Sequence, residues 1–294
     1  MVNEETLTWL LKMALEEDVG SGDWTTEWTV DPQVQGRAVI VAKKELVVAG
    51  TQVAWEVFRR VEPRLEVSIR APDGQALGVE EEVLQLQGPL RGILTGERVA
   101  LNFLGRLSGI ATLTRRFVDA VEGTGARILD TRKTTPGWRE LEKAAVVAGG
   151  GENHRMGLHD MVLVKDNHLV AGGGVGATVA RIQAHNTLGL EVEVEVNTLA
   201  ELEELLPLGV DRVLLDNMSV DTMREAVARI RSLGQSRPRV EASGNMDLGS
   251  VREVAETGVD FISVGALTHS APQADLSLRI LERSDRVSDH QKRG

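Results

Sequence analysis

Short apolar segments alternate with helical patterns along the second half of this chain. From residue 126 onward the apolar segments are ARILDT, MVLVK, LEVEVEV, DRVLLD, RVEAS and DFISVG, and a segment of helical pattern separates each from the next. This alternation is typical of right-handed βαβ units and a parallel sheet. About six units of this kind predict either an open doubly wound sheet or a short closed barrel.

Polar residues at the ends of these strands favour the barrel. The strand ends carry Asp130, Arg132, Lys133, Lys165, Glu195, Asp216, Glu241 and Ser243. In a barrel all strands deliver such residues to one mouth, whereas an open sheet gathers only those at its switch point. We therefore expect one site built at the C-terminal ends of the strands.

The first hundred residues have a different organisation. A helical pattern over residues 7–16 precedes β-rich stretches such as RAVIVAKKELVVAG and LEVSIRAPDG, and we expect the strands of this region to cluster without intervening helices. A long helix is expected over residues 96–121, where apolar residues recur at helical spacing. This region is predicted to be a small mixed α/β unit.

Composition excludes several functional classes. The chain has no cysteine, which rules out disulfides, thiolate nucleophiles and cysteine-ligated metal centres. Its net charge of −11 argues against a general affinity for nucleic acid. No apolar run approaches membrane-spanning length, and the N-terminus lacks the layout of a signal peptide. We expect no membrane association and a cytoplasmic location.

Two adjacent cations follow the first strand of the βα half, in ILDTRKTTPGWR. Arg132 and Lys133 precede Thr135 and Pro136, which resemble a cap and a first-turn proline, so a helix N-terminus is expected to add positive potential there. The arrangement predicts an anion site. The alternative is a pair of surface cations matched by acidic neighbours such as Asp130.

Further cations support the anion site. His154 and Arg155 follow a triple glycine, and Lys165 ends the apolar strand MVLV. A lysine in that place needs an acidic partner, or serves as the Schiff-base lysine of an aldolase barrel. Arg106 interrupts the apolar face of the long helix, so it either has a desolvated partner or reaches outward to solvent.

Carboxylates and small loops complete the pattern. Glu191, Glu193 and Glu195 alternate with valines, and neither face of a parallel sheet is solvent, so Glu195 must meet a lysine, a metal ion or sugar hydroxyls. Asp216 faces the same constraint. Two carboxylates opposite several cations suit a Mg²⁺-chelated diphosphate or a ribose diol. The loops ASGN and VGALTHS follow the last two strands, where barrels commonly bind phosphate.

Eight ordered motifs together resemble the quinolinate phosphoribosyltransferase family. They are GRLSGIAT, DTRKTTPG, NHRMGLHD, LVKDNH, EVEV, LLDN, EASGN and VGALTHS, and the N-terminal pattern LxxALxEDxGxGDxT extends the match to nearly the whole chain. Asn245 stands where a second glycine is also common in this family. The resemblance implies a type II phosphoribosyltransferase-like α/β fold. Its parts would be an N-terminal open-faced α/β sandwich domain over residues 1–110 and an incomplete α/β barrel of six or seven strands over 111–294, with the last residues able to pack back on the first domain.

The resemblance also implies an activity and its site. The reaction would be Mg²⁺-dependent transfer of phosphoribose from phosphoribosyl pyrophosphate to quinolinate, with decarboxylation, in NAD biosynthesis. A homodimer would share its active sites, with Arg106 supplied by the partner subunit. The implied catalytic residues are Lys133, Lys165, Glu195 and Asp216, of which Glu195 and Asp216 would hold Mg²⁺ directly or through water. The remaining implied substrate-binding residues are Arg106, Arg132, His154, Arg155, Ser243, Gly244, Asn245, Gly265, Ala266 and His269. A paralogue acting on another heteroaromatic acid and an aldolase-type barrel using Lys165 stay open as alternatives.

Overall fold

The computed structural model describes residues 3–284 and contains two compact units. The first unit comprises the chain up to Leu113, residues Thr135–Gly150 and the residues from Ala271 on, and the second comprises Thr114–Thr134 and Gly151–Ser270. The expected domains, 1–110 and 111–294, divide the chain differently, because two segments of the C-terminal half belong to the first unit. Among the described residues, no helix has the length and apolarity needed to cross a membrane.

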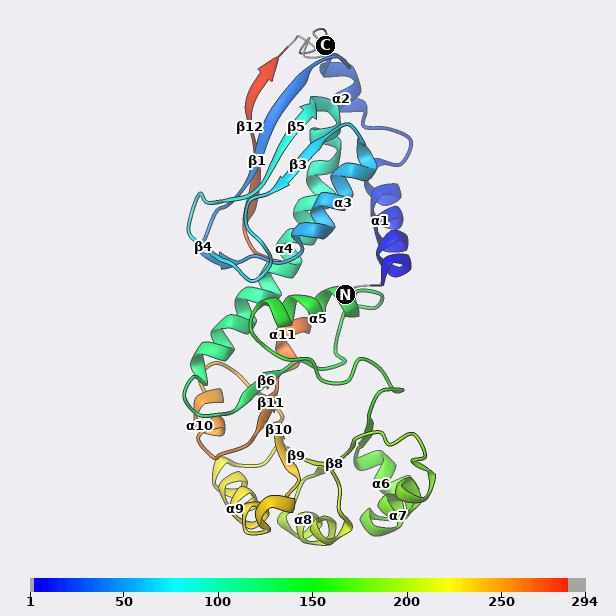
Figure 1. Ribbon diagram of the computed structural model, residues 1–294, viewed down its shortest axis with the longest axis vertical. Coiled ribbons are helices and arrows are strands. Elements are labelled where there is room, and N and C mark those ends of the chain that lie inside the picture. The colour runs from blue at the N-terminus through cyan, green and yellow to red at the C-terminus, as the bar shows by residue number, and fades with distance from the viewer. Residues whose placement is uncertain (1–2, 285–294) are drawn as a thin grey trace, which may run out of the picture. The chain divides into compact units, whose positions relative to one another are not determined.

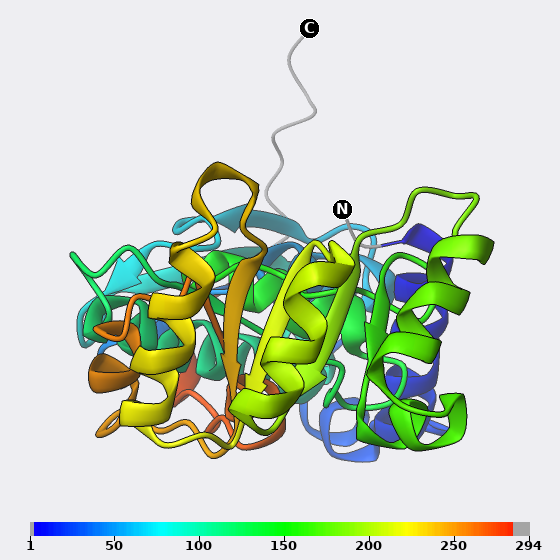
Figure 2. The ribbon, with the colours of Figure 1, turned by 90° about the horizontal axis from the view of Figure 1, so that it is seen from below.

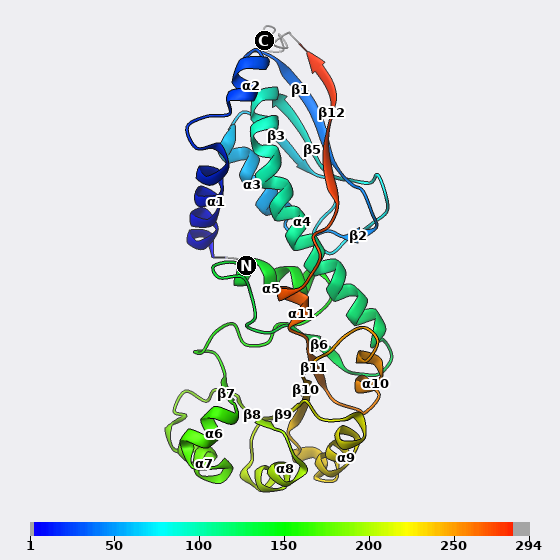
Figure 3. The same cartoon turned by 180° about the vertical axis from the view of Figure 1, so that it is seen from behind.

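The first unit is built on an antiparallel sheet with the strand order β12-β1-β5-β3, beside a small β2-β4 pair. Figures 1 and 3 show α3 and α4 lying along one face of the larger sheet. In chain order the elements are α1 (Glu4–Val19), α2 (Trp24–Thr29), β1 (Gln35–Ala42), β2 (Leu46–Val47), α3 (Thr51–Val61), β3 (Glu66–Ile69), β4 (Ala76–Leu77), β5 (Glu82–Pro89), α4 (Leu90–Ala120), α5 (Arg139–Ala148) and β12 (Leu276–Ser284). The last turns of α4 continue into the second unit.

Local sequence explains much of the first unit, but α3 lies between β2 and β3, so the expectation that its strands cluster without intervening helices is wrong. Asn3 caps α1 by accepting the backbone N–H groups of Glu5 and Thr6, and the expected helix and the expected long helix α4 are both confirmed. The strand β12 was not predicted. Leu276, Leu278 and Ile280 alternate with polar residues as in a strand, but the segment was expected only to be able to pack back on the first domain, and most of its side chains are exposed on the sheet edge. The last dozen residues were expected to fray, and residues 285–294 lie outside the described chain.

The second unit is a parallel sheet with the strand order β6-β11-β10-β9-β8-β7. Its elements are β6 (Arg127–Leu129), β7 (Val162–Val164), α6 (Asp166–Gly172), α7 (Val175–His185), β8 (Val192–Val196), α8 (Leu199–Leu205), η1 (Leu206–Leu208), β9 (Arg212–Asp216), α9 (Val220–Arg231), η2 (Gly234–Ser236), β10 (Arg239–Ser243), α10 (Val251–Ala255), β11 (Phe261–Ser263) and α11 (Ala266–His269). All six predicted strands are confirmed. The last of them pairs with the first, as in a barrel, whereas β6 and β7 are not paired with each other in the described chain. The unit is therefore an incomplete barrel of six strands.

Helices cover the outside of this barrel and leave its interior polar. Figure 2 shows α7, α8 and α9, coloured green to yellow, on the outer side of the strands. In β8 the valines are buried on one side, and Glu193 and Glu195 point to the opposite side because side chains alternate along a strand. The three-carboxylate pattern of the sequence thus places acidic groups inside the barrel.

Aromatic and cationic side chains pack together at the N-terminal ends of the strands. The Phe261 ring lies 4.3 Å from the guanidinium carbon of Arg127, 4.4 Å from that of Arg212 and 5.6 Å from that of Arg239. Glu191 accepts hydrogen bonds from Arg212 and Arg239, at 3.0 and 2.6 Å. Because charge pairing and stacking hold this end together, the other end of the barrel, where the strands finish, is the place for a site.

Candidate active site

A cavity of about 300 Å³ opens at the C-terminal ends of the barrel strands. Its lining residues all belong to the second unit. Six of them were predicted from the sequence: Arg132, Lys133, His154, Arg155, Lys165 and Ser243. Five were not assigned to the site: Thr131, Leu163, Leu214, Glu241 and Ser263. Leu163, Leu214, Glu241 and Ser263 lie in strands, where the alternation of side chains from a neighbouring predicted residue identifies them, and Thr131 lies in the loop after β6.

Asp130 joins the two cationic segments of the cavity. It is fully buried at the end of β6, and its carboxylate accepts the backbone N–H of His154 at 2.9 Å. An isolated bridge between Leu129 and Glu152 sets the same two segments side by side. A buried carboxylate thus holds the DTRK and NHR segments together, which places Arg132 beside Arg155.

The helix expected after these cations begins later than predicted. Residues 135–138 form a turn, with the Trp138 N–H donating to the Thr135 carbonyl, and α5 begins at Arg139. Gly137 has φ 81°, a conformation that a right-handed helix does not contain. The prediction that a helix N-terminus adds to the positive potential of Arg132 and Lys133 is therefore wrong. Their positive potential comes from neighbouring side chains.

Arg155 is held among these cations. One guanidinium nitrogen donates to the Met161 carbonyl at 3.2 Å. Partial burial lowers the pKa of Arg155, and the nearby charge of Arg132 lowers it further. Two guanidinium groups that repel each other in a concave, partly dry place favour the binding of an anion between them.

The His154 ring is engaged on both sides. Its Nδ1 accepts the backbone N–H of Arg155 at 2.7 Å, so the ring proton lies on Nε2, which donates to Glu193 at 3.0 Å. The His154 side chain is only 6% exposed. This histidine lines the cavity and also fixes the backbone that carries Arg155.

Two fully buried carboxyl groups lie beneath His154. Burial raises the pKa of both Glu193 and Glu241 to about 7, and the charge of Glu193 adds to the effect on Glu241. Arg212 donates to Glu241 at 3.0 Å. Each glutamate keeps one buried oxygen, Oε1, without a hydrogen-bond partner in the described chain. Near neutral pH the pair therefore holds a proton part of the time.

His154 and the two glutamates form the one group of possible metal ligands among the described residues. Ligand atoms of His154, Glu193 and Glu241 all lie within 4.8 Å of one another. Arg212 already provides the cation for this group, and the histidine proton points at the carboxylates. These features suit a proton and an arginine better than a metal ion.

Lys165 and Glu195 form the pair that the sequence analysis required. The ammonium lies 3.1 Å from the Glu195 carboxylate, whose side chain is 7% exposed, whereas that of Lys165 is 51% exposed. Lys165 therefore has the acidic partner that was expected, and its side chain is only partly buried at the cavity. Its charged and wet surroundings differ from the apolar pocket that activates a Schiff-base lysine.

A second set of predicted residues lies around Lys133. The backbone of Gly265 approaches the Lys133 side chain and the His269 ring so closely that a Cβ on Gly265 would lie 3.0 and 3.2 Å from them. Thr268 donates its hydroxyl proton to the Lys133 carbonyl at 2.8 Å. Ala266 begins α11 at this point. The structure thus gathers the β6 loop and the last βα loop around one lysine.

The remaining predicted residues follow β9 and β10. Asp216 and Ser243 are neighbours in the parallel register of these strands. Gly244 and the exposed Asn245 come next in the chain after Ser243. The Asp216 carboxylate accepts a hydrogen bond from the Asn217 amide at 2.7 Å.

Arg106 belongs to the first unit and has a desolvated partner there. Its guanidinium donates to one oxygen of the fully buried Glu142 at 3.0 and 2.7 Å. Glu142 also accepts the hydroxyl and backbone N–H of Thr135. The outward-reaching alternative is therefore wrong for Arg106, whose side chain is one quarter exposed.

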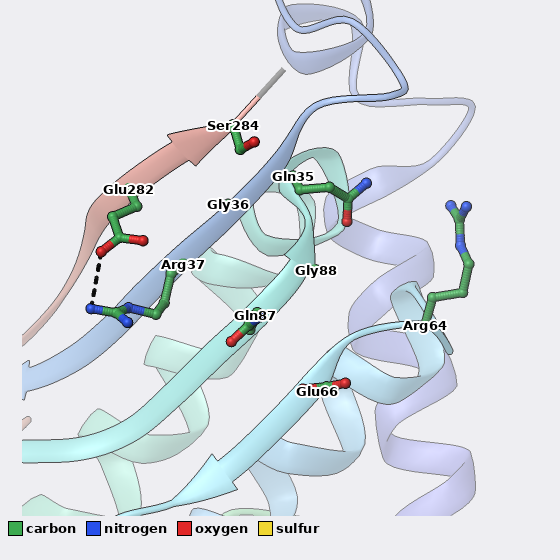
Figure 4. Close-up of a pocket in the computed structure, with 9 residues that line it drawn as sticks. All are labelled: Gln35, Gly36, Arg37, Arg64, Glu66, Gln87, Gly88, Glu282 and Ser284. Atoms are coloured by element: carbon green, nitrogen blue, oxygen red, sulfur yellow. Dashed lines mark ion pairs between the residues drawn. The ribbon is translucent and has the colours of Figure 1, made fainter. Parts of the chain in front are cut away.

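Another cavity, of about 330 Å³, lies on the sheet of the first unit. Figure 4 shows that its lining side chains come from β1, β3, β5, β12 and the loop before β3. Arg37 pairs with Glu282 at 3.2 Å across the strands, and Arg64 pairs with Glu62 at 2.6 Å. The cations of this cavity are matched by carboxylates of the same unit, whereas at the barrel mouth the charge of Arg132 acts on Arg155.

Comparison with known proteins finds relatives of one family along most of the chain. Residues 23–108 match the family model for the quinolinate phosphoribosyl transferase N-terminal domain, and residues 110–279 match that for its C-terminal domain. A probable nicotinate-nucleotide pyrophosphorylase [carboxylating] from Synechocystis is 44% identical over 92% of this chain and 91% of its own length. The solved nicotinate-nucleotide pyrophosphorylase from Francisella tularensis is 36% identical, with a TM-score of 0.90 over 95% of this chain and 98% of that chain. NadC from Streptococcus pyogenes is 39% identical, with a TM-score of 0.90 over 96% and 99%.

Proposed function

This chain belongs to the quinolinate phosphoribosyltransferase family, and from that premise we propose that it makes nicotinate mononucleotide, diphosphate and CO₂ from quinolinate and phosphoribosyl pyrophosphate. The observation that carries the proposal is the crowding of Arg132 and Arg155 at the barrel mouth, with Lys133 and Lys165 in the same cavity lining. Quinolinate has two adjacent carboxylates. A cavity lined by four cations together with Leu163 and Leu214 suits a flat ring with this charge.

The chain's own residues supply binding and charge stabilisation. Arg132, Arg155 and Lys165 would hold the two carboxylates, so that the pyridine nitrogen faces the anomeric carbon of the sugar. Lys133 would stabilise the diphosphate as the bond to it breaks. The phosphate at the other end of the sugar would lie on Ser243, Gly244, Asn245, Gly265, Ala266 and His269. No nucleophilic side chain is required, since the ring nitrogen forms the new bond as diphosphate leaves. The positively charged nitrogen then stabilises the electron pair left on the adjacent ring carbon when CO₂ departs, and a proton adds to that carbon.

Glu195 and Asp216 are proposed to hold Mg²⁺. Both provide carboxylate oxygens, the ligands that this ion prefers. One oxygen of each is already engaged, by Lys165 and by Asn217, so a water-mediated arrangement fits the two groups better than tight chelation. When bound, Mg²⁺ neutralises charge on the diphosphate.

The first prediction is turnover by the purified protein. Quinolinate, phosphoribosyl pyrophosphate and Mg²⁺ together are expected to yield CO₂ and diphosphate in equal amounts, measured with carboxyl-labelled quinolinate and a coupled diphosphate assay. Chelation of Mg²⁺ is expected to reduce the rate by more than tenfold, since the leaving group then keeps its full charge. Nicotinate in place of quinolinate is the control acceptor. Turnover of nicotinate but not of quinolinate would assign the chain to a different acid, and no turnover of either would refute the proposal.

We also propose a homodimer in which Arg106 enters the partner's site. The support is that Arg106 is held rigidly by Glu142 in the first unit, whereas the cavity lining comes entirely from the second unit. A cytoplasmic location is part of the same proposal, for which the absence of cysteine is the supporting feature.

Coexpression of two inactive chains tests the shared site. Arg106→Ala and Lys133→Ala chains together are expected to recover about one quarter of wild-type activity, because half of randomly formed dimers are mixed and each mixed dimer has one intact site. The matched control combines Arg132→Ala with Lys133→Ala, whose residues line the same chain's cavity. That pair should recover nothing. Equal recovery in both mixtures, or none in the first, would exclude the shared arrangement.

A further inference from the structure

Asn217 has a backbone conformation that few residues with a side chain adopt. It follows β9 directly and has φ 51°, and among the described residues only Glu80 is a second non-glycine residue with positive φ. Asparagine tolerates this left-handed region better than most residues. Backbone strain at the mouth of a barrel often accompanies function, although it identifies none by itself.

Three contacts of Asn217 connect two neighbouring strand ends. Its side-chain amide donates to Asp216 Oδ2 at 2.7 Å, and its backbone N–H donates to the Ser243 carbonyl at 3.1 Å. A carboxylate only accepts hydrogen bonds, so the amide nitrogen must be the atom that faces it. The other side of the amide lies against Gly244, where a Cβ would come within 2.6 Å of Asn217 Oδ1. Gly244 itself has φ 135°, and its lack of a side chain makes room for the amide.

These contacts couple the residues to which the proposed function assigns the sugar. Asp216 is assigned to the ribose or to its Mg²⁺, and Ser243 and Gly244 are assigned to the phosphate. Because Asn217 engages one oxygen of Asp216, the orientation of the other oxygen is fixed as well. Because the same residue contacts Gly244, a rotation of the Asp216 side chain and a shift of the phosphate loop cannot occur independently.

We propose that Asn217 is a positioning residue that holds the Asp216 carboxylate and the Ser243–Gly244 turn in one arrangement for phosphoribosyl pyrophosphate. The inference rests on the proposed function. It assigns Asn217 to the phosphoribosyl donor alone, because the described contacts of Asn217 reach neither Arg132, Arg155 nor Lys165.

Two substitutions distinguish the role of the Asn217 side-chain amide from that of its backbone conformation. Asn217→Gly removes the amide and keeps the left-handed conformation at no steric cost, whereas Asn217→Ala removes the amide and strains the backbone. Both variants are expected to weaken phosphoribosyl pyrophosphate binding about 10- to 150-fold, the loss of one hydrogen bond to a charged group. Only the alanine variant is expected to unfold at a lower temperature. The KM for quinolinate should stay within about twofold of wild type in both.

The measurements are calorimetric titration with phosphoribosyl pyrophosphate and Mg²⁺, steady-state kinetics for each substrate, and thermal unfolding. Ser219→Ala is the matched control, since it removes the N-cap of α9 in the same loop without a contact to Asp216. It should lower stability and leave donor binding unchanged. Wild-type affinity in Asn217→Gly, or equal losses for both substrates, would overturn the positioning role alone. Failure of the wild-type protein to bind the donor would overturn the proposed function and this inference together.

Discussion

Replacing Arg155 with alanine is expected to lower kcat/KM for quinolinate by about 10²- to 10³-fold, because truncating one partner of a partly desolvated guanidinium–carboxylate pair costs about 3–4 kcal/mol. The guanidinium is held by the Met161 carbonyl and lies close enough to Arg132 for that charge to lower its pKa. The loss should be present in the equilibrium Kd for quinolinate measured by calorimetry. It should also be present in the rate, since a displaced ring nitrogen no longer faces the sugar.

The same substitution is expected to leave the folded protein as stable as wild type, or more stable. Without a bound diacid, Arg155 and Arg132 repel each other. Removal of one guanidinium therefore removes a repulsion that destabilises the ligand-free folded protein. A thermal unfolding curve measured alongside the kinetics tests this separation. A fall in stability that matches the fall in activity would mean that Arg155 supports the fold, and the cationic cavity would lose its main support.

Two further variants show whether charge or shape matters at this position. Arg155→Lys keeps the charge and loses the planar fork that grips a carboxylate with two parallel hydrogen bonds, so it is expected to recover only part of the activity. Arg224→Ala is the matched control, because Arg224 is 47% exposed in the same unit and pairs with Asp221 on the surface. It should change kcat/KM by less than about twofold.

The sequence predicted the barrel because its evidence is local. Each buried strand and its helix carry their own periodicity, and the polar residues at strand ends follow from the alternation of side chains. The pairing of Lys165 with Glu195 was foreseeable, since a carboxylate inside a parallel sheet must meet a cation. Six of the residues lining the cavity were also predicted from the sequence.

Residues whose partners are distant in the sequence were harder to predict. Glu142 lies on a helix and has no unusual neighbours in the chain, yet it is fully buried because Arg106 and Thr135 come to it. Glu241 was read only as a strand-end residue, because its partners His154 and Arg212 come from other strands and loops. The start of α5 was missed because Pro136 was interpreted as a first-turn helix residue, although Pro-Gly is also a typical central pair of a β-turn in which the glycine has a positive φ.

Replacing Glu241 with glutamine is expected to stabilise the protein at pH 8 by about 1–3 kcal/mol and to change its stability little at pH 5. Burial and the charge of Glu193 raise the pKa of Glu241 from 4.5 to about 7. Between these two values the folded protein binds more protons than the unfolded chain, so its stability falls as the pH rises through this window. Glutamine has the shape of the protonated acid and does not ionise, so this loss disappears.

The hydrogen bond from Arg212 to Glu241 does not reverse the expected sign of the change in stability. Arg212 donates to Glu241 and also to Glu191, and the charge of Glu193 acts on it as well, so it keeps acidic partners in the variant. The raised pKa of Glu241 means that desolvation and the repulsion from Glu193 together outweigh the attraction of Arg212 and His154. Removal of one of two crowded carboxylates then leaves Glu193 with the attraction of Arg212 and the hydrogen bond from His154.

Urea unfolding at pH 5 and pH 8 measures this difference, and Glu191→Gln provides a control on the same arginine. Glu191 is 29% exposed and accepts hydrogen bonds from Arg212 and Arg239, so its replacement is expected to destabilise the protein at both pH values. The two variants should therefore differ in sign at pH 8. If Glu241→Gln were less stable than wild type at pH 8, the carboxylate of Glu241 would be a net favourable partner of Arg212. The floor of the cavity would then hold two full negative charges beneath a dianionic substrate, an arrangement that the four cations at its mouth would have to offset.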